Sequence, residues 1–148
     1  MSKKSGSNEV QELSIFEVGP ITCALHISDI QEINKHIEWS RVENAPDYIR
    51  GISNLRGSII TIIDMRKKFG LEQKTVDEDT RVVVVKNQDE QIGLLVDKML
   101  DVVMANSEDM EPTPSNVSGV AGNYFSSIYK MDNKLAALLD TNEILTIK

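Results

Sequence analysis

The sequence predicts an all-β protein, built either as a barrel or as a sandwich. About ten short apolar stretches are separated by turn residues and recur roughly every 8–12 residues, which is typical of such folds. Several of these stretches alternate apolar and polar side chains with a period of two, as strands with one buried face do. Few segments have the periodicity of a helix, so only a few short helices are expected.

Composition places the chain among ordinary globular proteins of one domain. It has 148 residues, of which 41% are hydrophobic and 26% are charged. The net charge of −7 disfavours nucleic acid as a partner, because phosphate binding needs a basic surface. No apolar run approaches the roughly 20 residues of a membrane span, and MSKKSGSNEV lacks the apolar core of a signal peptide. We therefore expect a cytoplasmic protein without membrane insertion, with residues 1–12 forming a disordered tail.

The first strands are predicted on either side of a Gly-Pro turn. Leu13–Val18 and Ile21–Ile27 have the alternation expected of a hairpin. Cys23 lies on the apolar face of the second strand and is expected to be a small buried hydrophobe; as the only cysteine, it cannot form an internal disulfide. Ile30–Ile33 resumes the alternation and contains Glu32, a carboxylate in a position that strands usually avoid.

The central stretch, residues 51–70, has the sequence GISNLRGSIITIIDMRKKFG and organises the rest of the chain. It predicts a polar turn at 52–56 and, at 58–63, a strand with both faces covered. Asp64 is expected to cap a short helix that follows, because its side chain can accept from free N–H groups of the first turn. Gly70 is expected to end that helix.

Glycines and polar residues of the central stretch are expected to set its geometry. Gly51 and Gly57 bracket the turn and are predicted to be structural, because glycine adopts backbone conformations that other residues resist. Asn54 is expected to stabilise the turn, and Arg56 lies at its tip. A positive charge held on a loop by rigid neighbours is where we expect function. A proline just before the stretch predicts a short helix at 46–49.

The second half of the chain is predicted to continue as strands joined by turns and loops. A charged loop at 71–79 comes first. Strands are then predicted at Val82–Val85, Ile92–Val96, Val102–Met104, Tyr124–Met131 and Leu135–Leu139. A long loop is expected at 107–118, and Thr141 is expected to cap a final short helix.

The chain lacks the motifs of the common enzyme classes. It has no G-x-x-x-x-G-K-[ST] or G-x-G-x-x-G phosphate-binding loop and no G-x-S-x-G nucleophile elbow. His26 and His36 are its only histidines, and their spacing suits neither a zinc site nor a pairing with the single cysteine. We therefore predict a protein that is not an enzyme and that holds no metal or cofactor.

Four blocks of the sequence together point to a family. They are FEVGPITCALHISDIQEI, PDYIRGISNLRGSIITIIDMRKKFG, IGLLVDKMLDVV and KLAALLDTNEIL, and the similarity extends over about residues 13–145, nearly the whole chain. In this order and at this spacing they resemble the CheW family of bacterial chemotaxis coupling proteins. The resemblance implies a domain at 13–148 made of two packed five-stranded β-barrels of the SH3 or OB type. Lobes are expected at about 13–70 and 80–145, and strands can exchange between them.

The same resemblance implies a scaffold without catalytic activity that links two partners. These are the cytoplasmic tip of methyl-accepting chemoreceptors and the regulatory domain of the histidine kinase CheA, in arrays at the membrane. Thr61, Cys23 and Tyr129 depart from the residues common in the family, but threonine and tyrosine are good strand residues and the fold should tolerate them. Two alternatives are an OB-like nucleic-acid-binding module and a regulatory domain of another two-component system. The net charge and the few aromatic residues argue against the first.

The candidate receptor-binding residues, carried over from the family motif, are Ile30, Glu32, Asn54, Arg56 and Gly93. Arg56 is expected either to pair with a receptor carboxylate or to form an internal tie with Glu32 that braces the two lobes. Ile30 is expected either to contact the receptor or to pack in the core. Gly93 lies in a strand, where glycine permits the close approach of another backbone.

Overall fold

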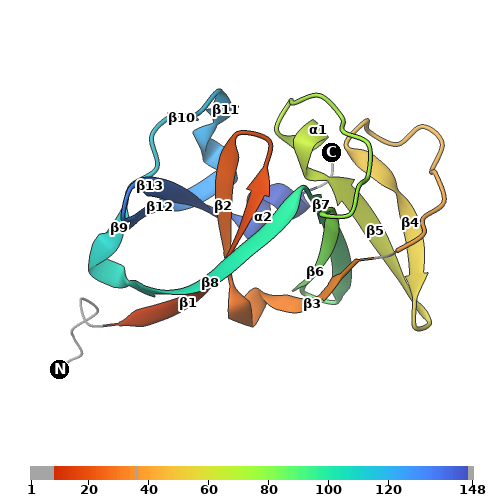
Figure 1. Cartoon of the computed structure of the whole chain (residues 1–148). Helices are drawn as coiled ribbons and strands as arrows, with labels where there is room; N and C mark the ends of the chain where they lie inside the picture. Colours follow the sequence, from red (N-terminus) through yellow and green to blue (C-terminus); the bar gives the residue numbers. More distant parts are fainter. Residues whose placement is uncertain (1–8, 36, 147–148) are drawn as a thin grey trace.

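The computed structural model describes residues 9–35 and 37–146, and nearly all of its regular structure is β (Figure 1). Two sheets, one of six strands and one of five, pack together, and a separate pair of very short strands lies beside the six-stranded sheet. The helices are short and lie at the ends of strands. The prediction of a mostly β protein with a few short helices is confirmed.

The six-stranded sheet brings together the two ends of the chain. Its order is β8-β1-β2-β13-β12-β9. The hairpin predicted around the Gly-Pro turn is confirmed, because β1 and β2 pair antiparallel from Val18↔Ile21 to Leu13↔His26. The strands are β1 (Val10–Val18), β2 (Ile21–His26), β8 (Lys98–Asn106), β9 (Met110–Glu111), β12 (Phe125–Met131) and β13 (Lys134–Leu139).

Strand β1 is longer than predicted. It begins at Val10, which is inside the range expected to be a disordered tail, because Val10 pairs with Asn106 of β8 and Gln11 pairs with Ala105. The tail prediction is therefore wrong for residues 10–12, and residues 1–8 lie outside the described part of the chain.

The five-stranded sheet is formed by the middle of the chain, in the order β3-β6-β7-β5-β4. Its strands are β3 (Ile30–Asn34), β4 (Ile49–Leu55), β5 (Ser58–Asp64), β6 (Arg81–Asn87) and β7 (Glu90–Val96). The sheets therefore mix the ranges 13–70 and 80–145. Strand β2 pairs in parallel with β13, and β5 pairs in parallel with β7. The chain passes from one sheet to the other through the single turn η2 (Ile27–Asp29) and again at Asp97, the one residue between β7 and β8.

Two predictions around the central stretch are wrong. Residues 46–49 do not form a helix: 47–48 make a turn and Ile49 begins β4, where it pairs with Ile63. Residues 52–55 are not a polar turn, since they belong to β4 in register with β5, and only Arg56 and Gly57 turn. Both errors have one cause, because the neighbouring strand β5 supplies partners that the local sequence does not reveal.

The short helices follow their predicted caps with one change. Helix α1 (Met65–Lys68) is capped by Asp64, whose side chain accepts from the Lys67 N–H at 3.2 Å, as predicted. Helix α2 (Thr141–Leu145) is capped by Asp140 rather than by Thr141, because the Asp140 carboxylate accepts from the Glu143 N–H at 3.2 Å.

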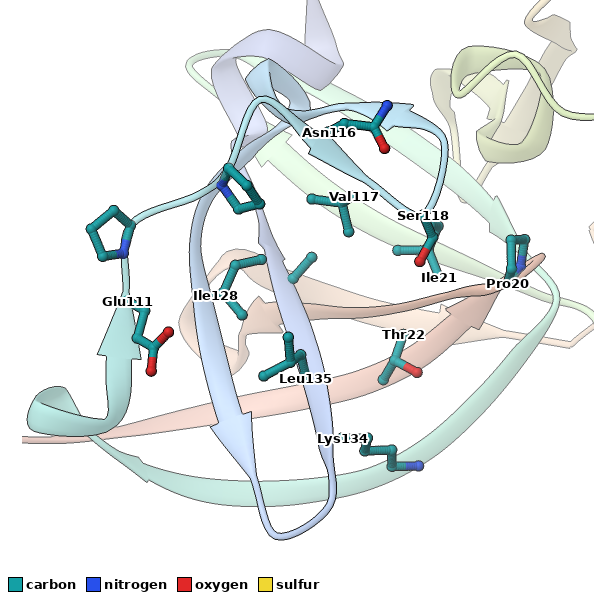
Figure 2. Close-up of a pocket in the computed structure, with 13 residues that line it drawn as sticks. Pro20, Ile21, Thr22, Glu111, Asn116, Val117, Ser118, Ile128, Lys134 and Leu135 are labelled. Atoms are coloured by element: carbon teal, nitrogen blue, oxygen red, sulfur yellow. The ribbon is translucent and has the colours of Figure 1, made fainter.

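The segment predicted as a loop at 107–118 contains short regular elements. They are η3 (Ser107–Asp109), β9 and β10 (Asn116–Val117). Strand β10 pairs with β11 (Val120–Ala121), which leads through η4 (Gly122–Tyr124) to β12. This segment folds back over one face of the six-stranded sheet (Figure 2).

The largest apolar cluster takes side chains from both sheets. Phe16 and Cys23 come from the six-stranded sheet, while Ile63, Val83 and Leu94 come from the five-stranded sheet, and each is at most 1% exposed. Cys23 is thus the small buried hydrophobe that its strand position predicts. Two smaller clusters each belong to one sheet. The shared cluster stabilises the pairing of the sheets without directional contacts, because the hydrophobic effect is non-directional.

Candidate functional site

The site predicted around Arg56 lies at the end of the five-stranded sheet where the β4–β5 turn is located. Arg56 lies in the β4–β5 turn, and Glu32 lies on β3. Strands β3 and β4 are the two edges of this sheet, and an ion pair between Arg56 Nη2 and Glu32 Oε1 joins them. The internal tie between these residues is present, but it connects two parts of one sheet. It does not connect the two sheets.

The two charges of this ion pair differ in exposure. The Glu32 side chain is 25% exposed, and its second carboxylate oxygen accepts from the Asn34 side-chain amide at 2.7 Å. The Arg56 side chain is 69% exposed. Glu32 is therefore held in place by two neighbours, whereas most of the Arg56 guanidinium remains accessible to a partner. An ion pair as open as this contributes only about 0.2–1 kcal/mol to stability.

The other predicted site residues differ in how deeply they are buried and in what they contact. Ile30 is half-buried on β3 and packs against the cluster shared by both sheets. The Asn54 side chain accepts from the Gly57 N–H at 2.9 Å, which closes the turn that presents Arg56. Gly93 is buried in β7, where it faces side chains of the neighbouring strands. The structure therefore brings Glu32, Asn54 and Arg56 together and places Gly93 apart from them, in the interior.

Gly51 lies where another segment of the chain approaches the backbone closely. The Ser40 carbonyl lies so close to the Gly51 Cα that a Cβ there has no room. Ser40 and Ile52 exchange backbone hydrogen bonds of 2.8 and 2.9 Å, so the 37–40 segment adds a short bridge to the edge of β4. Gly51 thus lets this segment cover the edge of the sheet.

Sequence reasoning missed several exposed apolar side chains. Ile59 is 61% exposed, although the isoleucine run of β5 was predicted to be covered on both faces. On the other sheet, Val102 and Met104 are 53% and 62% exposed on β8, an edge strand. The position of Ile59 next to the turn could have predicted its exposure, because residues at the end of a strand have fewer neighbouring residues that cover them.

A cavity of about 620 Å³ lies under the 112–118 segment (Figure 2), and Arg56 is not among the residues that line it. Its floor is formed by the buried side chains of Ile21, Ile128 and Ala137. Of the described residues that line it, Glu111 and Lys134 are the charged ones, and Glu111 forms an ion pair with Lys130 at 3.4 Å. Within residues 9–35 and 37–146, no cluster of histidine, cysteine and carboxylate side chains has the arrangement of a metal site.

Comparison with known proteins decides the family. The model of the CheW-like domain matches residues 12–148, almost the whole chain. The chain belongs to the CheW-like family. Chemotaxis protein CheW of Klebsiella aerogenes is 32% identical over 146 residues, which cover 99% of this chain and 88% of that protein. Chemotaxis protein CheW of Helicobacter pylori is 33% identical over 144 residues, with 97% and 87% coverage.

The same fold is found in a solved CheW-like structure. The crystal structure of the scaffolding protein TtCheW from Thermoanaerobacter tengcongensis matches with a TM-score of 0.87 and 26% identity, covering 95% of both chains. This CheW-like chain is accordingly a non-enzymatic scaffold of chemotaxis, as its sequence predicts. In the described part of the chain, no helix is long and apolar enough to cross a membrane.

Proposed function

We propose that this CheW-like chain couples the cytoplasmic tip of methyl-accepting chemoreceptors to the regulatory domain of the histidine kinase CheA. It acts in the cytoplasm, at receptor arrays. The observation that carries this proposal is the match to CheW-like proteins over residues 12–148, almost the whole chain. A coupling protein must bind two partners at once, so it needs two separate surfaces.

The receptor surface in this proposal is the end of the five-stranded sheet where the β4–β5 turn meets β3. Ile30 supplies apolar contact there, and Arg56 supplies an exposed positive charge beside the Glu32 carboxylate. Chemoreceptor tips are helical hairpins, and an apolar surface with a charge at its rim suits an amphipathic helix. Asn54 and Gly93 enter as supports, since Asn54 closes the turn and Gly93 lets the strands behind it pack closely.

The kinase surface in this proposal is an exposed sheet edge that carries apolar side chains. Among the described residues, β8 at the edge of the six-stranded sheet meets this description, with Val102 and Met104, and it lies in the other sheet from Arg56. Exposed apolar residues next to free backbone groups favour association with another protein. Met104→Glu puts a charge on this edge and is expected to weaken kinase binding, whereas Ile59→Glu, beside the receptor surface, is expected to leave kinase binding unchanged.

The receptor assignment is tested with Arg56→Glu, on protein first shown to be folded by circular dichroism. Reversal of the rim charge is expected to weaken receptor binding by about 1–3 kcal/mol, because an attractive contact becomes repulsive. Kinase binding is expected to stay unchanged. The two affinities are measured by separate titrations with a receptor fragment and with the kinase regulatory domain.

A charge swap separates the receptor contact from the internal tie. The double variant Glu32→Arg/Arg56→Glu restores an ion pair within the protein, but it leaves the wrong charge at the rim. Receptor binding is expected to stay weak in the double variant. If binding recovers, or if Arg56→Glu weakens both partners equally, Arg56 is an internal tie and the receptor surface lies elsewhere.

A further inference from the structure

One carboxylate joins the two sheets at the point where the chain crosses between them. Asp97 is the single residue between β7 of the five-stranded sheet and β8 of the six-stranded sheet. Its Oδ2 accepts from the Gly19 N–H, in the β1–β2 turn, at 2.7 Å. Its Oδ2 and Oδ1 also accept from Nε of Arg66 at 2.9 and 3.1 Å. Arg66 belongs to α1, which directly follows β5 (Figure 1). The Asp97 carboxylate therefore connects both sheets.

The groups of this link are held by further hydrogen bonds. The Asp97 N–H donates to the Glu17 carbonyl of β1 at 3.0 Å, and Nη1 of Arg66 donates to the Glu72 carbonyl at 3.1 Å. The side chains of Asp97 and Arg66 are only 15% and 24% exposed. Charge-assisted hydrogen bonds of this kind, largely shielded from water, have defined directions and are stronger than neutral ones.

The link differs in role from the ion pair of Arg56 and Glu32. That pair joins two edges of a single sheet, so it has no influence on how the sheets are oriented. Other connections between the sheets include the turn η2, the shared apolar cluster and a hydrogen bond of 3.0 Å from Nζ of Lys68 on α1 to the Thr146 carbonyl after α2. Apolar contacts tolerate small rotations, because they have no preferred direction. The carboxylate of Asp97 is therefore a directional restraint near the second crossing, and its side-chain contacts reach both sheets.

We propose that the Asp97–Arg66–Gly19 link fixes the relative orientation of the two sheets and so couples the receptor to the kinase. This inference rests on the proposed function, in which the partners occupy separate surfaces of one scaffold. A scaffold transmits a change at one surface only if the other surface stands in a fixed relation to it. Asp97 and Arg66 are positioning residues in this scheme, and they contact neither partner.

The test uses Asp97→Asn, which keeps the side-chain shape and removes the charge, and Arg66→Lys, which keeps the charge and removes the guanidinium geometry. Lys67→Gln is the matched control, because Lys67 lies on the same helix but pairs with Asp47, which is 75% exposed. Receptor-dependent stimulation of kinase activity is expected to fall about 2- to 30-fold in both test variants, the range that altered coupling between sites produces. The control is expected to match the wild type.

A distance measurement provides the readout that separates positioning from mere stability. Spin labels on Ser58→Cys of β5 and Asn133→Cys of the β12–β13 turn report the separation of the sheets, and the buried Cys23 is not labelled. Both test variants are expected to broaden the distance distribution, while each partner binds with wild-type affinity.

An unchanged distance distribution, or a loss of both affinities in proportion to the loss of stimulation, would overturn the inference. If Asp97→Asn does not fold, the folded Arg66→Lys protein decides by the same two criteria. A wild-type protein that fails to bind receptor or kinase would instead refute the proposed function, so the two failures are distinguished.

Discussion

Gly93 provides a test of the packing inside the five-stranded sheet. A Cβ built at this position lies 2.7 Å from Cγ1 of Val82 and 2.8 Å from Cδ1 of Ile62. Both neighbours are buried, at 2% and 0% exposure, so they have little room to move. Carbon atoms prefer separations of about 3.5–4.0 Å, so each contact of a Gly93→Ala variant is short by roughly 1 Å.

Overpacking of this kind costs about 1–3 kcal/mol. For a chain of 148 residues this corresponds to a fall in Tm of about 2–12 °C, at roughly 2–4 °C for each kcal/mol. Without the clash, alanine would raise stability by about 0.4–1 kcal/mol, because it restricts the unfolded chain. The direction in which Tm changes in Gly93→Ala therefore decides between the two effects.

The assay is thermal and urea denaturation, followed by far-ultraviolet circular dichroism. Ile62→Val removes the Cδ1 atom that the new methyl group would strike, and alone it is expected to cost about 0.5–1.5 kcal/mol. In the Gly93→Ala background it is expected to cost less, since it also relieves the clash. A Gly93→Ala midpoint at or above that of the wild type would refute this reasoning, as would an equal effect of Ile62→Val in both backgrounds.

Three further predictions concern single residues. Gly57→Val is expected to cost about 1–3 kcal/mol, since Gly57 has a φ of +87°; an unchanged urea midpoint would contradict this. Burial raises the pKa of the Cys23 thiol, so iodoacetamide should label Cys23 in urea and not in the native protein. The side chain of Lys74 lowers the pKa of Asp77, so a proton titration by NMR should show this pKa rising in Lys74→Gln. Because folding lowers this pKa, the contribution of Asp77 to stability is present above its unfolded-state pKa and is lost as the pH falls through the folded value.

Local features of the fold were predictable where neighbours in sequence are also neighbours in space. The β1–β2 hairpin, the valine strand of β6 and the cap at Asp64 all depend on contacts within a few residues. The helix predicted at 46–49 failed because a proline suggested a helix start, while the actual partner of Ile49 is Ile63 on the next strand. Intrinsic propensity determines the secondary structure of such a segment only when no neighbouring strand pairs with it.

The candidate site was predictable in composition but not in arrangement. The tie between Arg56 and Glu32 followed from two charges in unusual places, a turn tip and a strand. The link at Asp97 had no such signal, because an aspartate between two strands is ordinary in a turn. Its role depends on Arg66 and Gly19, which approach it only through the packing of the sheets. Long-range juxtaposition of this kind has no local pattern.

The parallel pairing of β2 with β13 has a consequence for how the chain folds. Cys23 pairs with Ala137, so the six-stranded sheet closes only after nearly the whole chain has been brought together. The entropy of closing such a loop must be overcome before the contacts it permits form, which slows folding in proteins of high contact order. The six-stranded sheet cannot be cut out as a contiguous piece, because β1 and β2 precede the five-stranded sheet in the chain and β8 to β13 follow it. The two sheets also share the largest apolar cluster. We therefore expect a single cooperative unfolding transition, in which the two surfaces of the scaffold are gained and lost together.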